Sequence, residues 1–308
     1  GTTIAQLLAS KDNGVSLLCH DESIIKDVNQ HHRNCRYLPE SPLLHQQIIA
    51  LTLSHLEESC QDIDGLIIAV ASPYYRDILK RVKAVLDTIP VLSATKGMDI
   101  PSLKSCCEIA CEELSVPQRK KYAVLSGPNL AGEIYQGKPA ASTVASEDPG
   151  TASLFQDLLS SESFRVYVSS DMIGVSYGGI LKNIIAVAAG ILDELGLGVN
   201  AKAALMVRGL AEMKRYAVHA GAKADTLSGL SGFGDQVTTC MGPQSRNYSL
   251  GIRLARGESL AEILDSVSTV AEGVNTCRVI SRLAREQSLS MPITQIIYKV
   301  LFEDFPVK

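Results

Sequence analysis

The sequence of 308 residues contains no tryptophan, and aromatic residues make up only 5% of it. Proteins that bind single-stranded nucleic acid stack bases on exposed aromatic rings, and this chain has few rings to offer. An excess of basic charge is also lacking, because 33 acidic residues outnumber 29 basic ones and leave a net charge of −4. Nucleic-acid binding is therefore not expected.

No uninterrupted apolar stretch reaches the roughly 18 residues that indicate a membrane span. The longest, residues 184–192, is bounded by Lys182 and Asn183 before it and by Asp193 and Glu194 after it. We interpret it as a buried core helix and expect no membrane span. The apolar run at the start of the sequence is short and meets charged residues at once, so no secretion signal is visible.

None of the eight cysteines forms a C-x-x-C pair, and the sequence has no Walker A motif, no H-E-x-x-H motif and no Ser-His-Asp arrangement. Scattered thiols in a chain of this length favour a reducing, cytoplasmic compartment. Cys107 and Cys111 are four residues apart and could share one helix face. A zinc site needs two further ligands, so we expect no metal there.

Short apolar or β-branched runs alternate with helical patterns through the first half of the sequence. Strands are predicted at 15–19, 66–71, 91–94, 123–125 and 143–145, with helices at 4–10, 74–86 and 103–114. This alternation predicts a Rossmann-like α/β domain, in which helices cover both faces of a doubly wound and mainly parallel sheet.

From Asp171 onward, helical patterns replace the strands. Helices are predicted at 175–195, 203–220, 260–264, 274–285 and 294–301. Pro292 suits the first turn of the last helix. Because the composition changes at residues 169–171, we expect one domain over residues 1–170 and an all-helical one over residues 171–308.

The sequence opens with Gly1 leading straight into a helical pattern, without a preceding strand. A doubly wound domain normally starts with a strand and a glycine-rich turn, and the pyrophosphate of a dinucleotide lies at the start of the next helix. Gly1 could be the third glycine of a G-x-G-x-x-G motif whose first strand is missing, and an ordinary glycine outside any motif is the alternative. Asp21 lies where an acid that binds ribose is expected. The alternative for Asp21, and for His20 before it, is a solvated turn.

Lys182 lies in a helical run that is otherwise apolar or small, with two glycines one turn earlier. A lysine in such a run either extends its ammonium group to water or loses part of its hydration. Loss of hydration lowers the pKa of lysine toward neutrality, which suits proton transfer. The first reading makes Lys182 structural, and the second makes it a candidate acid or base.

Polar groups also follow two of the predicted strands, where ligands of open α/β sheets bind. Lys96 follows one strand, and Gly127 and Asn129 follow another. Further along, Ser245 can cap a helix beside Arg246, which would pair free backbone N–H groups with a guanidinium and suit a phosphate. Ordinary turns and a capped surface helix are the alternatives.

Nine short motifs follow one another along the chain. They are Ala94-Thr95-Lys96-Gly97, Ser126-Gly127-Pro128, Gly179-Ile180-Leu181-Lys182-Asn183-Ile184-Ile185-Ala186, Asn200-Ala201-Lys202-Ala203, Arg208-Gly209-Leu210-Ala211-Glu212-Met213, Gly232-Phe233-Gly234-Asp235, Ser245-Arg246-Asn247, Val270-Ala271-Glu272-Gly273 and Met291-Pro292-Ile293-Thr294. Together they span nearly the whole chain. In this order the sequence resembles the NAD(P)-dependent glycerol-3-phosphate dehydrogenases of the bacterial type.

The resemblance implies a dinucleotide-binding domain over residues 1–170 and a helical substrate domain over residues 171–308. It implies reversible hydride transfer between NAD(P)H and dihydroxyacetone phosphate, which gives sn-glycerol 3-phosphate for phospholipid synthesis. It makes Lys182 the general acid. The implied substrate-binding residues are Lys96, Gly127, Asn129, Lys182, Asp235, Ser245, Arg246 and Asn247. With Gly1 from the glycine motif, the implied cofactor-binding residues are Gly1, His20, Lys96, Ala131, Arg246, Val270 and Glu272.

The sequence departs from the family in the absent first strand, in Asn129, where Ser or Thr is usual, and in Glu194, which replaces a common glycine. A 3-hydroxyacid dehydrogenase of similar architecture is the alternative enzyme, but its lysine is followed by asparagine three residues later, whereas Asn183 is adjacent here. A non-catalytic, degenerate copy is the other alternative. The resemblance also implies a homodimer.

Overall fold

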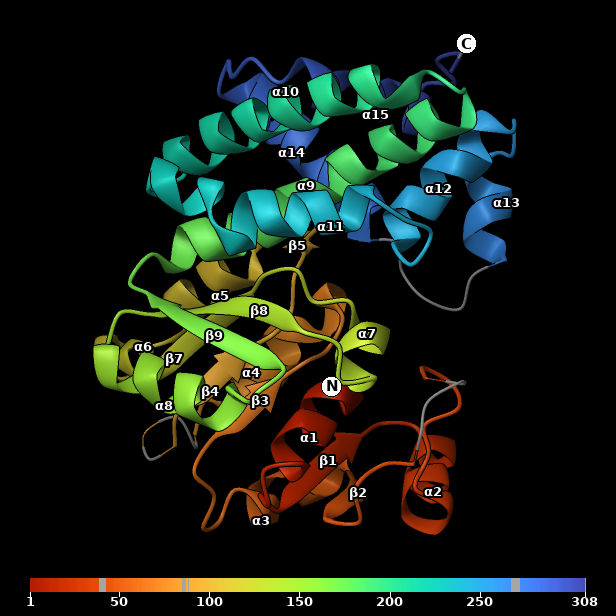
Figure 1. Ribbon diagram of the computed structural model, residues 1–308. Coiled ribbons are helices and arrows are strands. Elements are labelled where there is room, and N and C mark those ends of the chain that lie inside the picture. The colour runs from red at the N-terminus through yellow and green to blue at the C-terminus, as the bar shows by residue number, and fades with distance from the viewer. Residues whose placement is uncertain (39–42, 85–86, 88, 267–271, 308) are drawn as a thin grey trace.

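The computed structural model describes residues 1–38, 43–84, 87, 89–266 and 272–307. A domain built on a β-sheet lies beneath a bundle of helices, and helix α9 (Met172–Glu194) runs along the junction between them (Figure 1). The expected order, an α/β domain followed by a helical one, is confirmed.

Five strands form the main sheet, in the order β3-β4-β7-β8-β9. Their bounds are β3 (Leu66–Ile68), β4 (Val91–Ser93), β7 (Tyr122–Ser126), β8 (Ala140–Ser146) and β9 (Phe164–Ser169). Neighbours are parallel except for β7 and β8, which are antiparallel. The mainly parallel sheet is thus as predicted, while β9 was not anticipated.

Two further strands, β1 (Val15–Cys19) and β2 (Ile48–Thr52), pair in parallel as a separate sheet. The start of α1 (Thr2–Ala9) lies beside both sheets. A Cβ placed on Gly1 would be 4.0 Å from Leu17 of β1 and 3.8 Å from Ala69, just beyond β3. Both are ordinary van der Waals distances, so the start of α1 lies beside both sheets and a Cβ would fit there.

The remaining elements of this domain connect its strands. They are α2 (Glu22–His31), α3 (Leu56–Ser59), α4 (Tyr75–Val82), the strand pair β5 (Met98–Asp99) and β6 (Lys104–Ser105), α5 (Cys106–Glu113), α6 (Val116–Lys120), α7 (Ala131–Tyr135) and α8 (Pro149–Leu159). The helix predicted over 103–114 starts later than expected, because Leu103 has a φ of 56° and Ser105 caps α5 by accepting from the Glu108 N–H.

The second domain is entirely helical in its described residues. It consists of α9, α10 (Gly198–His219), α11 (Asp235–Cys240), α12 (Arg246–Ala255), α13 (Leu260–Asp265), α14 (Glu272–Glu286) and α15 (Pro292–Phe302). Pro292 occupies the first turn of α15, as predicted. After α9 the chain turns at Gly196 and Gly198, whose φ values are 66° and 81°. Glu194 therefore closes the helix and leaves the turn to glycines.

Helix α9 is the central helix of the second domain's hydrophobic core. Among the described helices, it alone is long and apolar enough to cross a membrane, yet 78% of its most apolar 18-residue window is buried inside the protein. It packs on the sheet domain below and on α10, α11, α12 and α14 around it. A helix that is apolar all round suits such a position, and the interpretation of residues 184–192 as a buried core helix is confirmed.

Candidate active site

The ammonium group of Lys182 is enclosed by the fold. Lys182 lies midway along α9, is only 8% exposed, and directs Nζ toward α11. There Nζ donates to Asp235 Oδ1 at 2.5 Å and to Thr239 Oγ1 at 2.7 Å. The ammonium group thus meets an ion pair and a hydroxyl inside the protein, and does not extend to water.

Asp235 joins Lys182 to a second lysine. Its other oxygen, Oδ2, accepts from Lys96 Nζ at 2.9 Å, and the same Nζ donates to the carbonyl of Gly127 at 3.1 Å. Lys96 follows β4 and Gly127 follows β7, so both approach from the carboxyl edge of the sheet. Two cations facing one carboxylate leave a net positive charge, which suits an anionic substrate or an oxygen that gains negative charge.

Burial changes the acidity of Lys182. Loss of hydration lowers the pKa of its ammonium to about 8, Asp235 opposes this shift, and the positive charge of Lys96 adds to it. A lysine with a pKa near the working pH can both give and take a proton.

The two glycines before Lys182 allow α9 to touch its neighbours. A Cβ on Gly178 would lie 2.4 Å from the carbonyl oxygen of Ser231, and one on Gly179 would lie 2.4 Å from Ser126 Oγ and 3.1 Å from the Cδ of Lys96. Any larger residue at these positions would displace the loop before Asp235 or the side chain of Lys96. Ser126 Oγ itself is buried and has no hydrogen-bond partner among the described residues.

A second group of site residues starts α12. Ser245 caps this helix by accepting from the Tyr248 N–H at 3.3 Å, as the sequence predicts. Asn247 is buried, and its Oδ1 accepts from the Gly273 N–H at 3.0 Å. Arg246 between them is exposed. This helix start therefore offers backbone N–H groups beside a guanidinium that forms no hydrogen bond with the described residues, and together these groups suit a phosphate.

Glu272, the first residue of α14, bridges the two domains. Its carboxylate accepts from Ser72 Oγ at 2.7 Å and from the Ser72 N–H at 3.2 Å. Burial raises the pKa of Glu272, while Ser72 and the charge of Arg246 oppose the shift. A Cβ on Gly97 would lie 2.5 Å from Glu272 Oε2, so only glycine fits beside Lys96. Val270 lies outside the described residues.

The other residues implied for the cofactor lie along the carboxyl edge of the sheets. Ala131 starts α7, and its carbonyl accepts from Thr3 Oγ1 of α1 at 3.3 Å. Gly1 and Ala131 therefore belong to adjoining helix starts. His20 is exposed just beyond β1. Asp21 caps α2 by accepting from Ser23 N–H at 2.9 Å.

Asn129 has a side-chain partner on the neighbouring strand. Ser142 Oγ of β8 donates to Asn129 Oδ1 at 2.5 Å, beside Gly127. Gly127 has a φ of 155°, and a Cβ there would lie 2.8 Å from the Cα of Ser142. Asn129 thus helps to fix the turn after β7, and its amide N–H₂ group remains for a ligand.

The residues present fit a dinucleotide at the start of α1. Gly1 brings no side chain to cap this helix, and its first turn contains no acidic residue. Free N–H groups at a helix start, with no competing carboxylate, are what a pyrophosphate requires. No group of three or more His, Cys, Asp or Glu side chains that could hold a metal occurs in the described residues.

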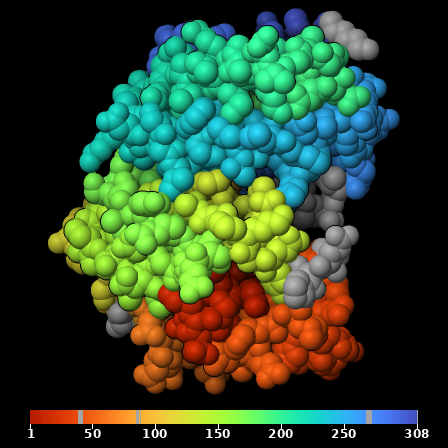
Figure 2. Space-filling view, viewed as in Figure 1, coloured from red at the N-terminus to blue at the C-terminus, as the bar shows by residue number. Residues whose placement is uncertain are grey.

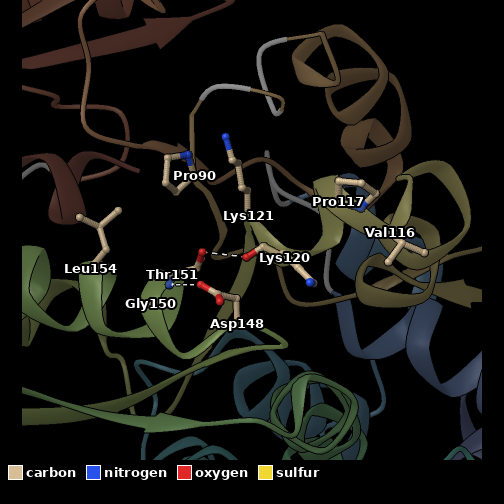
Figure 3. Close-up of a pocket in the computed structure, with 9 residues that line it drawn as sticks. All are labelled: Pro90, Val116, Pro117, Lys120, Lys121, Asp148, Gly150, Thr151 and Leu154. Carbon is tan, nitrogen blue, oxygen red and sulfur yellow. Dashed lines mark hydrogen bonds between the residues drawn. The ribbon is translucent and has the colours of Figure 1, made fainter.

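A cavity of about 490 Å³ lies elsewhere on the protein (Figure 3). Its lining includes Pro90, Val116, Pro117, Lys120, Lys121 and Leu154. Pro90 precedes β4 and Lys121 precedes β7, so the cavity opens at the amino edge of these parallel strands. Lys96 and Gly127 follow the same strands at the opposite edge. The cavity contains none of the motif residues and is separate from the candidate site.

Sequence reasoning missed two polar partners. Thr239 follows Asp235 by four residues in α11, and this helical spacing could have indicated that it shares a face with the carboxylate. Ser72 contacts Glu272 from 200 residues away, and no local pattern indicates that pairing.

A doubly wound domain joined to a helical one, with a buried lysine between them, defines a two-domain nicotinamide-dependent dehydrogenase. The protein-family model for the N-terminus of NAD-dependent glycerol-3-phosphate dehydrogenase matches residues 1–152. The family model for the C-terminus of the same enzyme matches residues 171–308. The chain belongs to this glycerol-3-phosphate dehydrogenase family.

Relatives are similar in sequence to this chain over its full length. A glycerol-3-phosphate dehydrogenase [NAD(P)+] of Geobacter sulfurreducens is 40% identical, over 100% of this chain and 91% of the relative. One from Staphylococcus haemolyticus is 38% identical, over 100% and 92%. The crystal structure of the Coxiella burnetii enzyme has a TM-score of 0.90 at 33% identity, and the match covers 99% of this chain and 92% of that one.

The family match over both domains does not support the alternative of a 3-hydroxyacid dehydrogenase. D-mandelate dehydrogenase with NADH has a TM-score of 0.61 at 12% identity, so the two share a fold only. The chain is an NAD(P)-dependent oxidoreductase, like the family whose motifs it carries.

Proposed function

We propose that Lys182 is the general acid for the reduction of dihydroxyacetone phosphate to sn-glycerol 3-phosphate, and the general base for the reverse reaction. The nicotinamide cofactor, when bound, supplies or accepts the hydride. The observation that carries this proposal is the buried ammonium of Lys182, whose pKa is lowered to about 8 mainly by loss of hydration. Near this pH, Lys182 Nζ can give a proton to a carbonyl oxygen and take it back.

Asp235 and Lys96 hold the acid in position in this mechanism. Asp235 orients Lys182 Nζ through a 2.5 Å contact and keeps much of it protonated, while Lys96 fixes the other carboxylate oxygen. The surplus positive charge stabilises the oxygen that becomes negative during hydride transfer. Gly127, whose carbonyl accepts from Lys96 Nζ, lines the same space together with Asn129.

Ser245, Arg246 and Asn247 bind the phosphate in this proposal. The start of α12 provides N–H groups, and Arg246 provides a guanidinium that is engaged in no hydrogen bond among the described residues. The charge of Arg246 also reaches Glu272, which supports a place for both beside the cofactor. Gly1, His20, Lys96, Ala131 and Val270 complete the proposed cofactor set.

We propose that the domain over residues 1–170 binds the dinucleotide and that the domain over residues 171–308 binds the substrate. We assign the reaction to the cytoplasm and to phospholipid supply. The eight cysteines are free thiols, which agrees with a reducing compartment.

A homodimer is also part of this proposal, and α10 supports it. Val199 and Val207 are 82% and 64% exposed, and Ala203 lies between them on the same face. Figure 2 shows α10 lying across the surface of the helical domain. Val207→Glu should shift the sedimentation coefficient from dimer to monomer, and Val116→Glu, exposed on α6, should leave it unchanged. A wild-type monomer at micromolar concentration would contradict the dimer.

The catalytic assignment is tested by Lys182→Ala. We expect NADH oxidation with dihydroxyacetone phosphate to slow by at least about 10²-fold, in line with the usual contribution of a general acid. Lys80→Ala, on the exposed face of α4, is the matched control and should leave turnover unchanged. Near-normal turnover of a folded Lys182→Ala protein would refute the assigned role.

A further inference from the structure

We propose that Asp193, Lys202 and Tyr248 form a positioning cluster that fixes the first turn of α12, and through it the residues that bind the substrate phosphate. None of the three touches the substrate in this proposal. The inference rests on the proposed phosphate site at Ser245–Asn247, and its test separates failure of the cluster from failure of that site.

The cluster joins three helices through one carboxylate oxygen. Asp193 Oδ2, near the end of α9, accepts from Tyr248 Oη of α12 at 2.5 Å and from Lys202 Nζ of α10 at 2.6 Å. Lys202 Nζ also lies 5.3 Å from the centre of the Tyr248 ring. Three mutual contacts fix the side chain of Tyr248 more tightly than a single hydrogen bond would.

Tyr248 connects this cluster directly to the phosphate site. Its backbone N–H donates to Ser245 Oγ, the cap of α12, and it follows Asn247 in the chain. Rotating Tyr248 about the axis of α12 would therefore move Ser245 and Asn247 with it. The cluster controls where the free N–H groups of this helix start point.

The backbones of α9 and α12 pack so closely that the distance between the two helices is fixed, and only rotation of α12 about its own axis remains to be controlled. A Cβ on Gly190 of α9 would lie 2.0 Å from the carbonyl oxygen of Tyr248, and one on Gly251 of α12 would lie 2.1 Å from the carbonyl oxygen of Val187. The two helices thus touch at two glycines, which fixes their separation. Contacts at glycines have no preferred direction, however, and the Tyr248 hydroxyl supplies a directional hydrogen bond between the two helices.

The charge states of the cluster support a lasting bond. The pKa of Asp193 lies below its ordinary value, because hydrogen bonds from Lys202 and Tyr248 outweigh the opposing effect of burial. Burial, followed by the nearby Asp193 carboxylate, raises the pKa of Tyr248 to about 12. Across neutral pH, Tyr248 therefore remains a donor and Asp193 an acceptor.

The same two helices carry a natural control at the other end of α12. Arg256, which caps the C-terminal end of this helix, donates Nε and Nη2 to Glu194 at 3.0 and 3.1 Å. This ion pair also joins α9 to α12, but it lies far along the helix from Ser245. If the cluster merely fastened α12 to α9, breaking either contact would have the same effect.

Tyr248→Phe removes the hydroxyl and keeps the ring, and Asp193→Asn removes the charge and keeps the shape. For both variants we expect the KM for dihydroxyacetone phosphate to rise about five- to tenfold, with kcat within about twofold and a smaller rise in the KM for NADH, to which Arg246 of the same turn contributes. Arg256→Gln should change none of these values. Unfolding midpoints measured alongside should identify any variant that has simply lost stability.

Two further measurements exclude a general loss of structure. Unphosphorylated dihydroxyacetone should be reduced with the same kcat/KM by wild type and Tyr248→Phe, because it does not use the phosphate site. In an Arg246→Ala background, Tyr248→Phe should have much less effect than in the wild type, because both act on the same phosphate contact.

The proposal is overturned if Arg246→Ala raises the KM for dihydroxyacetone phosphate and Tyr248→Phe does not. It is also overturned if Arg256→Gln raises that KM as much as Tyr248→Phe, or if reduction of dihydroxyacetone falls equally. If Arg246→Ala itself leaves the KM unchanged, the assigned phosphate site is wrong, and the cluster inference falls with it.

Discussion

Replacing Asp235 by asparagine should move the pH dependence of catalysis in a known direction. The substitution keeps the shape of the side chain and removes the charge that lies 2.5 Å from Lys182 Nζ. This charge opposes the loss of hydration that lowers the pKa of Lys182 to about 8. Removing a neighbouring opposite charge typically shifts a pKa by about 1 to 3 units, here downward.

The magnitude follows from the protonated fraction of Lys182. With a pKa of about 8, about 90% of Lys182 carries a proton at pH 7. If the pKa falls by about 2 units, only about 10% remains protonated at this pH. Turnover in the direction that needs a proton donor therefore drops about tenfold at pH 7 from protonation alone.

The assay is kcat against pH, measured in both directions on folded protein. In the reduction of dihydroxyacetone phosphate, the decline at high pH should shift to lower pH by about 1 to 3 units in Asp235→Asn. In the oxidation of glycerol 3-phosphate, which needs neutral Lys182, the rise from low pH should shift in the same sense. Thr239→Val, which removes a neutral contact to Lys182, should shift either profile much less. An unchanged profile, or a shift to higher pH, would refute the reasoning.

Three other predictions concern the same framework. Lys96→Met should shift the high-pH decline upward, because the charge of Lys96 lowers the pKa of Lys182; pH profiles of kcat test this, and a downward shift contradicts it. Gly190→Ala should reduce the free energy of unfolding in urea by more than about 2 kcal/mol, since its Cβ would lie 2.0 Å from a carbonyl oxygen of α12. Gly132→Ala, with nothing within 4 Å, should cost nothing in the same titration. Glu212→Gln should lower the free energy of unfolding, measured in the same urea titration, by about 1 to 3 kcal/mol, because the carboxylate accepts from three donors at the start of α15.

Local patterns predicted much of the fold. The run at 15–19 and the long helical patterns after residue 171 indicated the corresponding elements, and Ser245 indicated the start of α12. Strand β9 was missed, although alternating burial at Phe164 and Val166 matches its period-two pattern. The antiparallel pairing of β7 with β8 depends on contacts between strands, which no local pattern contains.

The sequence singled out candidate site residues but not their geometry. Lys96, Lys182 and Asp235 were chosen from their motifs, yet that both lysines share one carboxylate could not be derived from sequence, because 139 positions separate Lys96 from Asp235. Asp193 and Tyr248 carried no signal at all. They lie 55 positions apart and meet only because two glycines let α9 and α12 touch.

The lowered pKa of Lys182 follows from the role of α9 in the fold. This helix is buried along most of its length because it is packed against the sheet domain and the helices of the second domain around it. The side chain of Lys182, at its middle, is only 11% exposed, so its ammonium is paired inside the protein or loses its proton. Asp235 provides that pairing, but Lys96 shares the same carboxylate and leaves it incomplete. The Asp235 carboxylate, which the two lysines share, therefore sets the pKa of Lys182. Removing the charge of Asp235 should shift the pH profile to lower pH, and removing the charge of Lys96 should shift it to higher pH.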